Sequence, residues 1–402
     1  MSIDSLASAS VFSERTCETT IETLYSVLPP IYTSLFTSKD VTDLLQSATQ
    51  MPSCTILGAV DAKDRLLVEI LASKTRDGAL RVIVKSPPTA EDHLTGSKGQ
   101  WKSVSLGEGV SKKIYKAISF IINPDGTFKS PPSLIALAKI KATHYDPLTT
   151  ALVHRAQKEI PSPHLLAIPD GIFPHTRRNP TKERQYYLSM PLLEKPTLYD
   201  LLEGGPSRRS DKERWKIWTI GIANAAKGCL SLLEKGILHR DPTTMNITPD
   251  GIFDFDSICT LDEPHVRKGA ALKFLPPEIL IQRLHAAGLA RDKDLIKNIM
   301  TILKTRGYSP EEVVTWLREF STVYEVENPK LPALYYSDKS DVFILGAQCE
   351  VHFGAPETWP TDESTKGFIL TMTSPYEAAR PSMAEVSCFF EKLSSSIYTE
   401  PS

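Results

Sequence analysis

The sequence has few cysteines, and their spacing does not indicate a metal cluster. Six cysteines are scattered through the 402 residues, and no two of them form a Cys-x-x-Cys pair. Closely spaced cysteines are the usual signature of zinc sites and of small domains stabilised by disulfides. The scatter therefore argues against both classes of structure, and we expect reduced thiols.

The chain also lacks a large net charge and a long apolar run. Its 46 basic and 48 acidic residues leave a formal net charge of −2, which disfavours nucleic acid as a partner. No apolar stretch approaches the roughly 18 residues that a membrane span needs. No basic segment followed by an apolar one indicates a classical signal peptide. These absences predict a cytoplasmic protein without a membrane span, with non-classical secretion left open.

Three regions of different character predict the domain organisation. Residues 1 to about 50 show helical spacing, and residues 53–85 form short apolar runs separated by turn-like residues, which predicts a β-meander. A polar, proline-broken stretch at 86–99 is typical of a linker. We therefore expect an N-terminal accessory region at 1–99. Strands followed by helices then predict an α+β domain at 100–398.

Residues 239–246 contain the most specific pattern in the chain. They read His-Arg-Asp-Pro-Thr-Thr-Met-Asn, so four residues separate an aspartate from an asparagine. In-line phosphoryl transfer needs a carboxylate that accepts a hydroxyl proton and an amide oxygen that reaches the metal. Further along the chain, a Pro-Asp-Gly turn precedes residues 254–256, which read Asp-Phe-Asp.

These motifs resemble those of the eukaryotic-type protein kinase superfamily. The first is similar to the H-R-D-x-x-x-x-N catalytic loop, and the second to the D-F-G metal motif with its glycine replaced. Three later segments follow in the order of the family. They resemble the Pro-Glu end of an activation segment (269–278), the S-D-V-W-S-L-G helix (340–346) and the late Arg-Pro motif (379–382).

The resemblance implies roles for individual residues in this half of the chain. Asp241 would be the catalytic base, and Asp341 would hold the backbone of the catalytic loop. Glu278 and Arg380 would form a buried ion pair that fixes geometry rather than adding net stability. The implied magnesium ligands are Asn246, Asp254 and, as an extra ligand or a source of repulsion, Asp256.

Upstream segments resemble the ATP-binding half of the same family. Residues 106–110 are similar to a glycine-rich loop, whose glycines let backbone N–H groups approach phosphates. Residues 137–139 resemble the V-A-I-K strand, which implies that Lys139 contacts the α- and β-phosphates of ATP. Residues 187–194 resemble the linker between two lobes, with Met190 as gatekeeper. The implied nucleotide-binding residues are Gly107, Gly109, Val110, Ala138, Lys139, Met190, Pro191 and Leu193.

The resemblance implies a bilobal fold with an N-terminal α/β extension. The smaller, β-rich lobe would span about 100–193 and the larger, helical lobe about 194–398. Some fifty residues more than the family needs lie between Glu278 and Asp341, which predicts a helical insert at about 279–337. The insert would either extend the core of the larger lobe or recognise a partner or substrate, and residues 1–99 are a second candidate partner surface.

Several departures from the family pattern leave the activity open. Lys112 replaces a glycine of the phosphate loop, Thr243 replaces the lysine of the catalytic loop, and Asp256 replaces the glycine of D-F-G. No glutamate is in register to pair with Lys139, and Glu159 fits only after a shift. The interpretations are a serine/threonine protein kinase using ATP and Mg²⁺ on an unknown protein substrate, or a pseudokinase that acts as scaffold or allosteric partner. A small-molecule kinase is disfavoured by the three later motifs.

Overall fold

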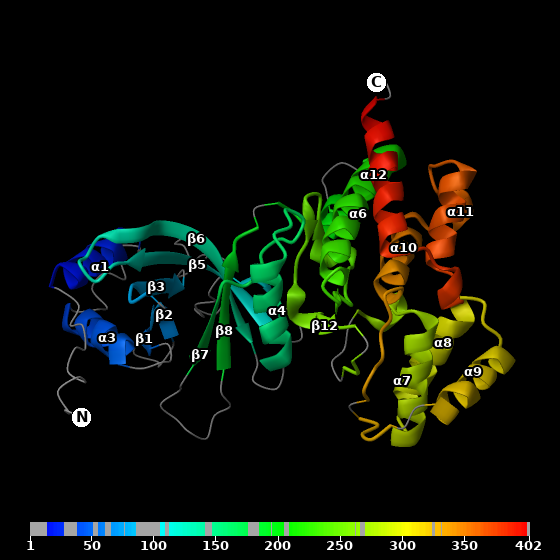
Figure 1. Ribbon diagram of the computed structural model, residues 1–402, viewed down its shortest axis with the longest axis horizontal. Coiled ribbons are helices and arrows are strands. Elements are labelled where there is room, and N and C mark those ends of the chain that lie inside the picture. The colour runs from blue at the N-terminus through cyan, green and yellow to red at the C-terminus, as the bar shows by residue number, and fades with distance from the viewer. Residues whose placement is uncertain are drawn as a thin grey trace, which may run out of the picture. The chain divides into compact units, whose positions relative to one another are not determined.

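In a computed structural model the chain divides into two compact units, shown as ribbons in Figure 1. Unit 1 comprises residues 1–146 and 169–193, and unit 2 comprises residues 147–168 and 194–402. The structure describes residues 14–27, 38–50, 55–60, 66–75, 77–85, 105–108, 112–140, 147–175, 185–193, 195–204, 209–261, 263–265, 270–323, 326–330 and 332–399. Within these ranges the protein is of mixed α+β class, as the sequence predicts.

Unit 1 is built around an eight-stranded antiparallel sheet in the order β1-β2-β3-β5-β6-β8-β7, with β4 paired to β5. The short apolar runs of the sequence become its strands, because alternating side chains cover the two faces of a sheet. The strands are β1 (Thr55–Val60), β2 (Leu66–Lys74), β3 (Leu80–Lys85), β4 (Ser105–Glu108), β5 (Lys112–Ile122), β6 (Phe128–Ile140), β7 (Gly171–His175) and β8 (Gln185–Pro191).

Two helices, α1 (Glu14–Val27) and α3 (Ser38–Gln50), cover one face of this sheet. Their apolar side chains, among them Leu24 and Leu45, pack with Val82 and Phe120 of the strands. The opposite face has a smaller apolar cluster formed by Leu71, Ile83, Ala117, Ile135, Leu137 and Tyr187. Burial on both faces explains the nearly continuous apolar character of residues 70–72 and 80–84.

The β-meander predicted at 53–85 is confirmed as β1, β2 and β3, but its sheet continues across the boundary expected near residue 99. Strand β3 pairs with β5 in antiparallel register, from Leu80 opposite Ile122 to Lys85 opposite Ala117. An isolated meander would leave an unpaired strand edge, and this pairing covers that edge. The N-terminal strands are therefore part of the same sheet as residues 105–191.

Unit 2 is predominantly helical. Its long helices are α4 (Pro147–Glu159), α6 (Asp211–Leu233), α7 (Pro277–Ala290), α8 (Lys293–Thr305), α9 (Pro310–Val323), α10 (Ser340–Phe353), α11 (Glu363–Met372) and α12 (Met383–Thr399), with the shorter α5 (Leu198–Glu203). Helix α6 begins at a capping box in which Ser210 and Glu213 bond each other's backbone N–H groups. Two short antiparallel strand pairs accompany these helices: β9 (Ile237–Leu238) with β12 (Cys259–Thr260), and β10 (Ile247–Thr248) with β11 (Gly251–Ile252).

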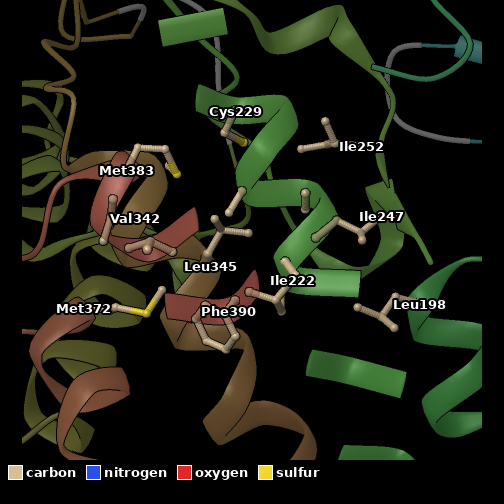
Figure 2. Packing of buried hydrophobic residues seen from close by; sticks show 14 of the residues in the cluster. Leu198, Ile222, Cys229, Ile247, Ile252, Val342, Leu345, Met372, Met383 and Phe390 are labelled. Atoms are coloured by element: carbon tan, nitrogen blue, oxygen red, sulfur yellow. The ribbon is translucent and has the colours of Figure 1, made fainter. Parts of the chain in front are cut away.

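The core of unit 2 lies around α6. Figure 2 shows Ile222 and Cys229 of this helix among side chains from distant parts of the chain, including Leu345 and Phe390. Ile247 and Ile252 of the β10–β11 hairpin belong to the same cluster. The segment that follows the catalytic-loop motif is therefore anchored in the main core.

The predicted insert is helical and contributes to the core of unit 2. Helices α7, α8 and α9 bury Ile279, Ile299 and Val313 in one cluster that also contains Ile344 of α10. Ser309 and Glu312 form the capping interaction that starts α9, as the spacing predicts. Of the two roles expected for the insert, extension of the core is confirmed.

The described part of the chain contains no helix with the length and apolar character that a membrane crossing requires. Its five cysteines, Cys17, Cys229, Cys259, Cys349 and Cys388, are all free thiols. The remaining cysteine, Cys54, lies outside the described residues.

Replacing Gly251 by Ala should destabilise unit 2 by about 2–3 kcal/mol, the cost typical of overpacking a tight site. A Cβ atom at this position would overlap the main-chain carbonyl of His164, whose oxygen accepts a hydrogen bond from Ile252 N–H. Urea unfolding followed by fluorescence would measure the loss. Gly288→Ala in α7 is the matched control, because its Cβ meets no atom within 4 Å. Equal stability of both variants would contradict the expectation.

Candidate active site

Asp341 holds the backbone of the His-Arg-Asp segment in unit 2. It lies in the first turn of α10 with 2% exposure, and its two carboxylate oxygens accept hydrogen bonds from the backbone N–H groups of His239 (2.8 Å) and Arg240 (2.7 Å). Arg240 adopts a left-handed backbone conformation (φ 63°), which is uncommon for a residue with a Cβ atom. The two bonds stabilise this conformation, and the role predicted for Asp341 is confirmed.

Asp241 follows directly and lies close to two other candidate residues. Asn246 donates a side-chain hydrogen bond to the main-chain oxygen of Asp241 at 3.0 Å. Burial, together with the nearby negative charge of Asp254, raises the pKa of Asp241 to about 7, although hydrogen bonds from Asn246 and Thr243 oppose the shift. The structure therefore brings Asp241, Asn246 and Asp254 together, with the two carboxylates near enough to repel each other.

Asp254 is held in place by the segment around it. It has a left-handed conformation (φ 66°), which aspartate tolerates better than most residues, and it caps the short 3-10 helix Phe255–Ser257. Phe253 N–H donates to Asn246 O at 2.9 Å, and the ring of Phe255 packs edge-on against His239. The Asp-Phe-Asp segment is therefore joined to residues 239–246 by a backbone hydrogen bond and ring packing.

The oxygen donors at this site suit Mg²⁺. The described residues include no group of three or more His, Cys, Asp or Glu side chains that would bind a metal by themselves. Magnesium, however, is usually held by one or two carboxylates together with the phosphates of a nucleotide. Asp254 and the amide oxygen of Asn246 meet this requirement, and a divalent cation would relieve the repulsion between Asp254 and Asp241. Asp256 is half-buried, and its backbone N–H donates to a carboxylate oxygen of Asp254 at 3.5 Å.

The predicted Glu278–Arg380 ion pair is confirmed. The two Nη atoms of Arg380 donate to the two carboxylate oxygens of Glu278 at 2.7 and 2.8 Å. The arginine side chain is fully buried, whereas the glutamate side chain is 27% exposed. This bidentate geometry ties the first turn of α7 to the segment that precedes α12.

In unit 1, the strands place Lys139 and two of the predicted nucleotide-binding residues on opposite faces of the sheet. Lys139 of β6 lies opposite Tyr187 of β8, whereas Ala136 lies opposite Met190. Because side chains alternate along a strand, Ala138 and Met190 point away from the Lys139 face. Lys139 and Met190 therefore lie on opposite faces of this sheet, and the gatekeeper role of Met190 stays a prediction. On that face β8 presents Tyr187 and Ser189.

Other predicted residues of unit 1 are only partly described. Gly107 lies in β4 opposite Ile114, Pro191 ends β8 and is exposed, and Leu193 follows it and is half-buried. Gly109 and Val110 lie outside the described residues. Lys112, at the start of β5, is 7% exposed.

Glu159, the glutamate that fits the family pattern only after a shift, has a partner in its own helix. It ends α4, is exposed, and pairs with Arg155 of its own helix at 3.1 Å. Sequence reasoning missed a different glutamate, Glu69, which lies in β2 on the Lys139 face of the sheet. The available signal was a single charged residue in the apolar run 66–71, where an unpaired charge would be costly.

A groove of about 720 Å³ lies beside the Glu278–Arg380 pair in unit 2. Its walls are rich in aromatic side chains, and none of its lining residues is basic. The aromatic lining residues are Trp316, Phe320, Tyr335, Tyr336 and Tyr376, and the acidic ones are Glu263, Glu278, Glu319 and Glu377.

Comparison with models of known protein families finds no match for the chain, and neither does comparison with curated proteins. The functional interpretation therefore depends on the residues and contacts described above. Among these contacts, the hydrogen bonds that Asp341 accepts from the backbone of His239 and Arg240 give the strongest support for a function.

Proposed function

We propose that this chain is an ATP-dependent protein serine/threonine kinase of bilobal, kinase-like fold. The observation that carries the proposal is the pair of hydrogen bonds from His239 and Arg240 to Asp341, which fixes Asp241 beside Asn246 and Asp254. A metal motif and a catalytic loop joined in this way are what phosphoryl transfer requires. Location in the cytoplasm remains a prediction.

In the proposed reaction, Asp241 accepts the proton of the serine or threonine hydroxyl as its oxygen attacks the γ-phosphorus. The bond from that phosphorus to the β–γ bridging oxygen breaks, and ADP leaves. A pKa of about 7 suits a general base that works near neutral pH. Asn246 and Asp254 would hold Mg²⁺, which would neutralise phosphate charge. From unit 1, Lys139 would contact the α- and β-phosphates.

Transfer of labelled γ-phosphate from ATP to a generic basic protein tests this proposal. We expect transfer that depends on Mg²⁺ and yields phosphoserine or phosphothreonine. Labelled small molecules with no labelled protein would favour the small-molecule kinase instead.

A pseudokinase is the second candidate. Thr243 leaves the transferred phosphoryl group without the positive charge of the family lysine, and Glu159 pairs with Arg155 within its own helix. Nucleotide binding without any transfer by the folded protein would support this alternative, in which the chain acts as a scaffold or allosteric partner.

The groove beside Glu278 supports a basic protein segment as the acceptor. Arg380 neutralises Glu278, but among the described residues no cationic side chain pairs with Glu319 or Glu377. Aromatic walls and free carboxylates together attract lysine and arginine side chains. We therefore place substrate recognition by the insert in this groove, next to α9.

Replacing both Glu319 and Glu377 by Lys should raise the KM for a basic protein acceptor about tenfold, with kcat and the KM for ATP unchanged. The expected size corresponds to about 1.4 kcal/mol of lost attraction. Steady-state kinetics at two salt concentrations would measure it. Glu357→Lys, an exposed position outside the groove, is the control. An unchanged KM in the double variant would place recognition elsewhere.

A further inference from the structure

Glu69 is a buried carboxylate in the middle of β2. It is 3% exposed, and its two oxygens accept hydrogen bonds from the hydroxyl of Tyr187 at 3.1 and 3.0 Å. Lys85 of β3 donates a further bond at 2.8 Å. A buried charge is tolerated when it is paired and hydrogen-bonded in this way.

The bond between Glu69 and Tyr187 joins strands that are distant in the sheet. Strands β3, β5 and β6 separate β2 from β8 in the strand order. The sheet must therefore curl so that its inner face brings β2 toward β8. Alternation along the strands places Lys85, Lys139 and Tyr187 on this same inner face.

Lys139 is near this carboxylate. Its Nζ atom lies 5.6 Å from the centre of the Tyr187 ring, whose hydroxyl bonds Glu69. Burial alone would raise the pKa of the Glu69 carboxyl, but the charges of Lys85 and Lys139 and the bonds from Lys85 and Tyr187 lower it below its usual value. Glu69 is therefore ionised and influenced by two lysines.

Lys85 has contacts of its own. Its Nζ atom also lies 4.1 Å from the ring centre of Tyr115, a favourable cation–π distance. Lys85 thus has a second source of stabilisation on the inner face. Pairing with Lys85 alone does not explain why β2 carries a buried carboxylate. Neutral residues of similar size in place of Glu69 and Lys85 would pack without a cost in stability.

We propose that Glu69 is a positioning residue for Lys139, in the role that a helix glutamate has in the family that the chain resembles. The inference rests on the proposed function, since it assumes that Lys139 contacts the phosphates of ATP. It gives the N-terminal strands a part in the nucleotide site, because β2 supplies the carboxylate that orients the phosphate-binding lysine.

The test compares Lys85→Gln with the double variant Glu69→Gln/Lys85→Gln in the full chain. The first keeps the Glu69 carboxylate for Lys139, and the second removes it without leaving Lys85 buried and unpaired. Two readouts are measured on protein shown to be folded by circular dichroism. One is the Kd of a fluorescent ATP analogue with Mg²⁺, and the other is the rate of acetylation of Lys139 without nucleotide, followed by mass spectrometry.

We expect the double variant to bind the analogue about 10- to 100-fold more weakly than Lys85→Gln, as when a residue that orients a ligand-binding group is lost. Acetylation of Lys139 should become several-fold faster, because the loss of the Glu69 charge removes one interaction that favours the protonated lysine. Equal Kd values and equal acetylation rates would overturn the inference. If the wild type binds no nucleotide, the proposed function fails, and acetylation alone then decides whether Glu69 holds Lys139.

Discussion

Replacing Asp241 by Asn should lower kcat for phosphate transfer about 10³-fold, within the range typical of a lost general base. The amide keeps the size and hydrogen-bonding capacity of the carboxylate but cannot accept the hydroxyl proton. Asp254→Asn should reduce transfer by a similar factor for a different reason, because it removes the proposed carboxylate ligand of Mg²⁺. Its residual activity should require a higher Mg²⁺ concentration than that of Asp241→Asn, which keeps the proposed carboxylate ligand.

Asp250→Asn is the matched control for both variants. Asp250 lies only a few residues from Asp254, but it is exposed and pairs with Lys195 at 2.6 Å. We expect its transfer rate to stay within twofold of the wild type. Full activity in Asp241→Asn would show that another group accepts the proton. A wild type that binds nucleotide without transferring phosphate would support the pseudokinase interpretation.

Contacts between residues that belong to recognisable sequence motifs could be predicted from the sequence. The hydrogen bonds that Asp341 accepts, and the ion pair of Glu278 with Arg380, each join residues about 100 positions apart. Both followed from the resemblance, because each motif carries its own residue types at a recognisable place. The helical insert followed from apolar periodicity and from the Ser309 cap.

Contacts that depend on strand register could not be predicted in this way. The strings Leu-Ala-Lys and Ser-Met-Pro do not say which side chains share a face until Lys139 is known to lie opposite Tyr187. A shift of one residue reverses every side chain of a strand. The polar segment at 86–99 was read as a domain boundary because pairing between β3 and β5 is non-local. Glu69 was missed for the same reason, since its partner Tyr187 is 118 residues away.

The same carboxylates predict an unusual dependence of stability on pH. Asp241 has an ordinary pKa of 3.8 that rises to about 7 in the folded protein, with burial as the main cause. Between these pH values the folded state binds more protons than the unfolded state, so stability falls as pH rises through this window. Asp341, whose pKa is raised to about 6, acts in the same direction.

Asp241→Asn should therefore be more stable than the wild type by about 2–4 kcal/mol at pH 8 and equally stable at pH 4, in buffer containing EDTA. The amide resembles the protonated carboxyl at every pH, and a shift of one pKa unit corresponds to about 1.4 kcal/mol. Urea unfolding followed by tryptophan fluorescence would measure the difference. Four of the five tryptophans (Trp215, Trp218, Trp316 and Trp359) lie in unit 2 and report on its unfolding.

Mg²⁺ should remove most of this difference at pH 8. Binding of a cation by the ionised carboxylates stabilises the folded wild type by mass action, and Asp241→Asn gains less because it has lost one of the two negative charges. Asp250→Asn should follow the wild type at every pH. A stability difference between Asp241→Asn and the wild type that does not grow between pH 4 and pH 8 would show that the pKa of Asp241 is not raised in the folded protein. If the folded protein gives up stability to hold these carboxylates together for catalysis, then the inactive variant should be the more stable protein.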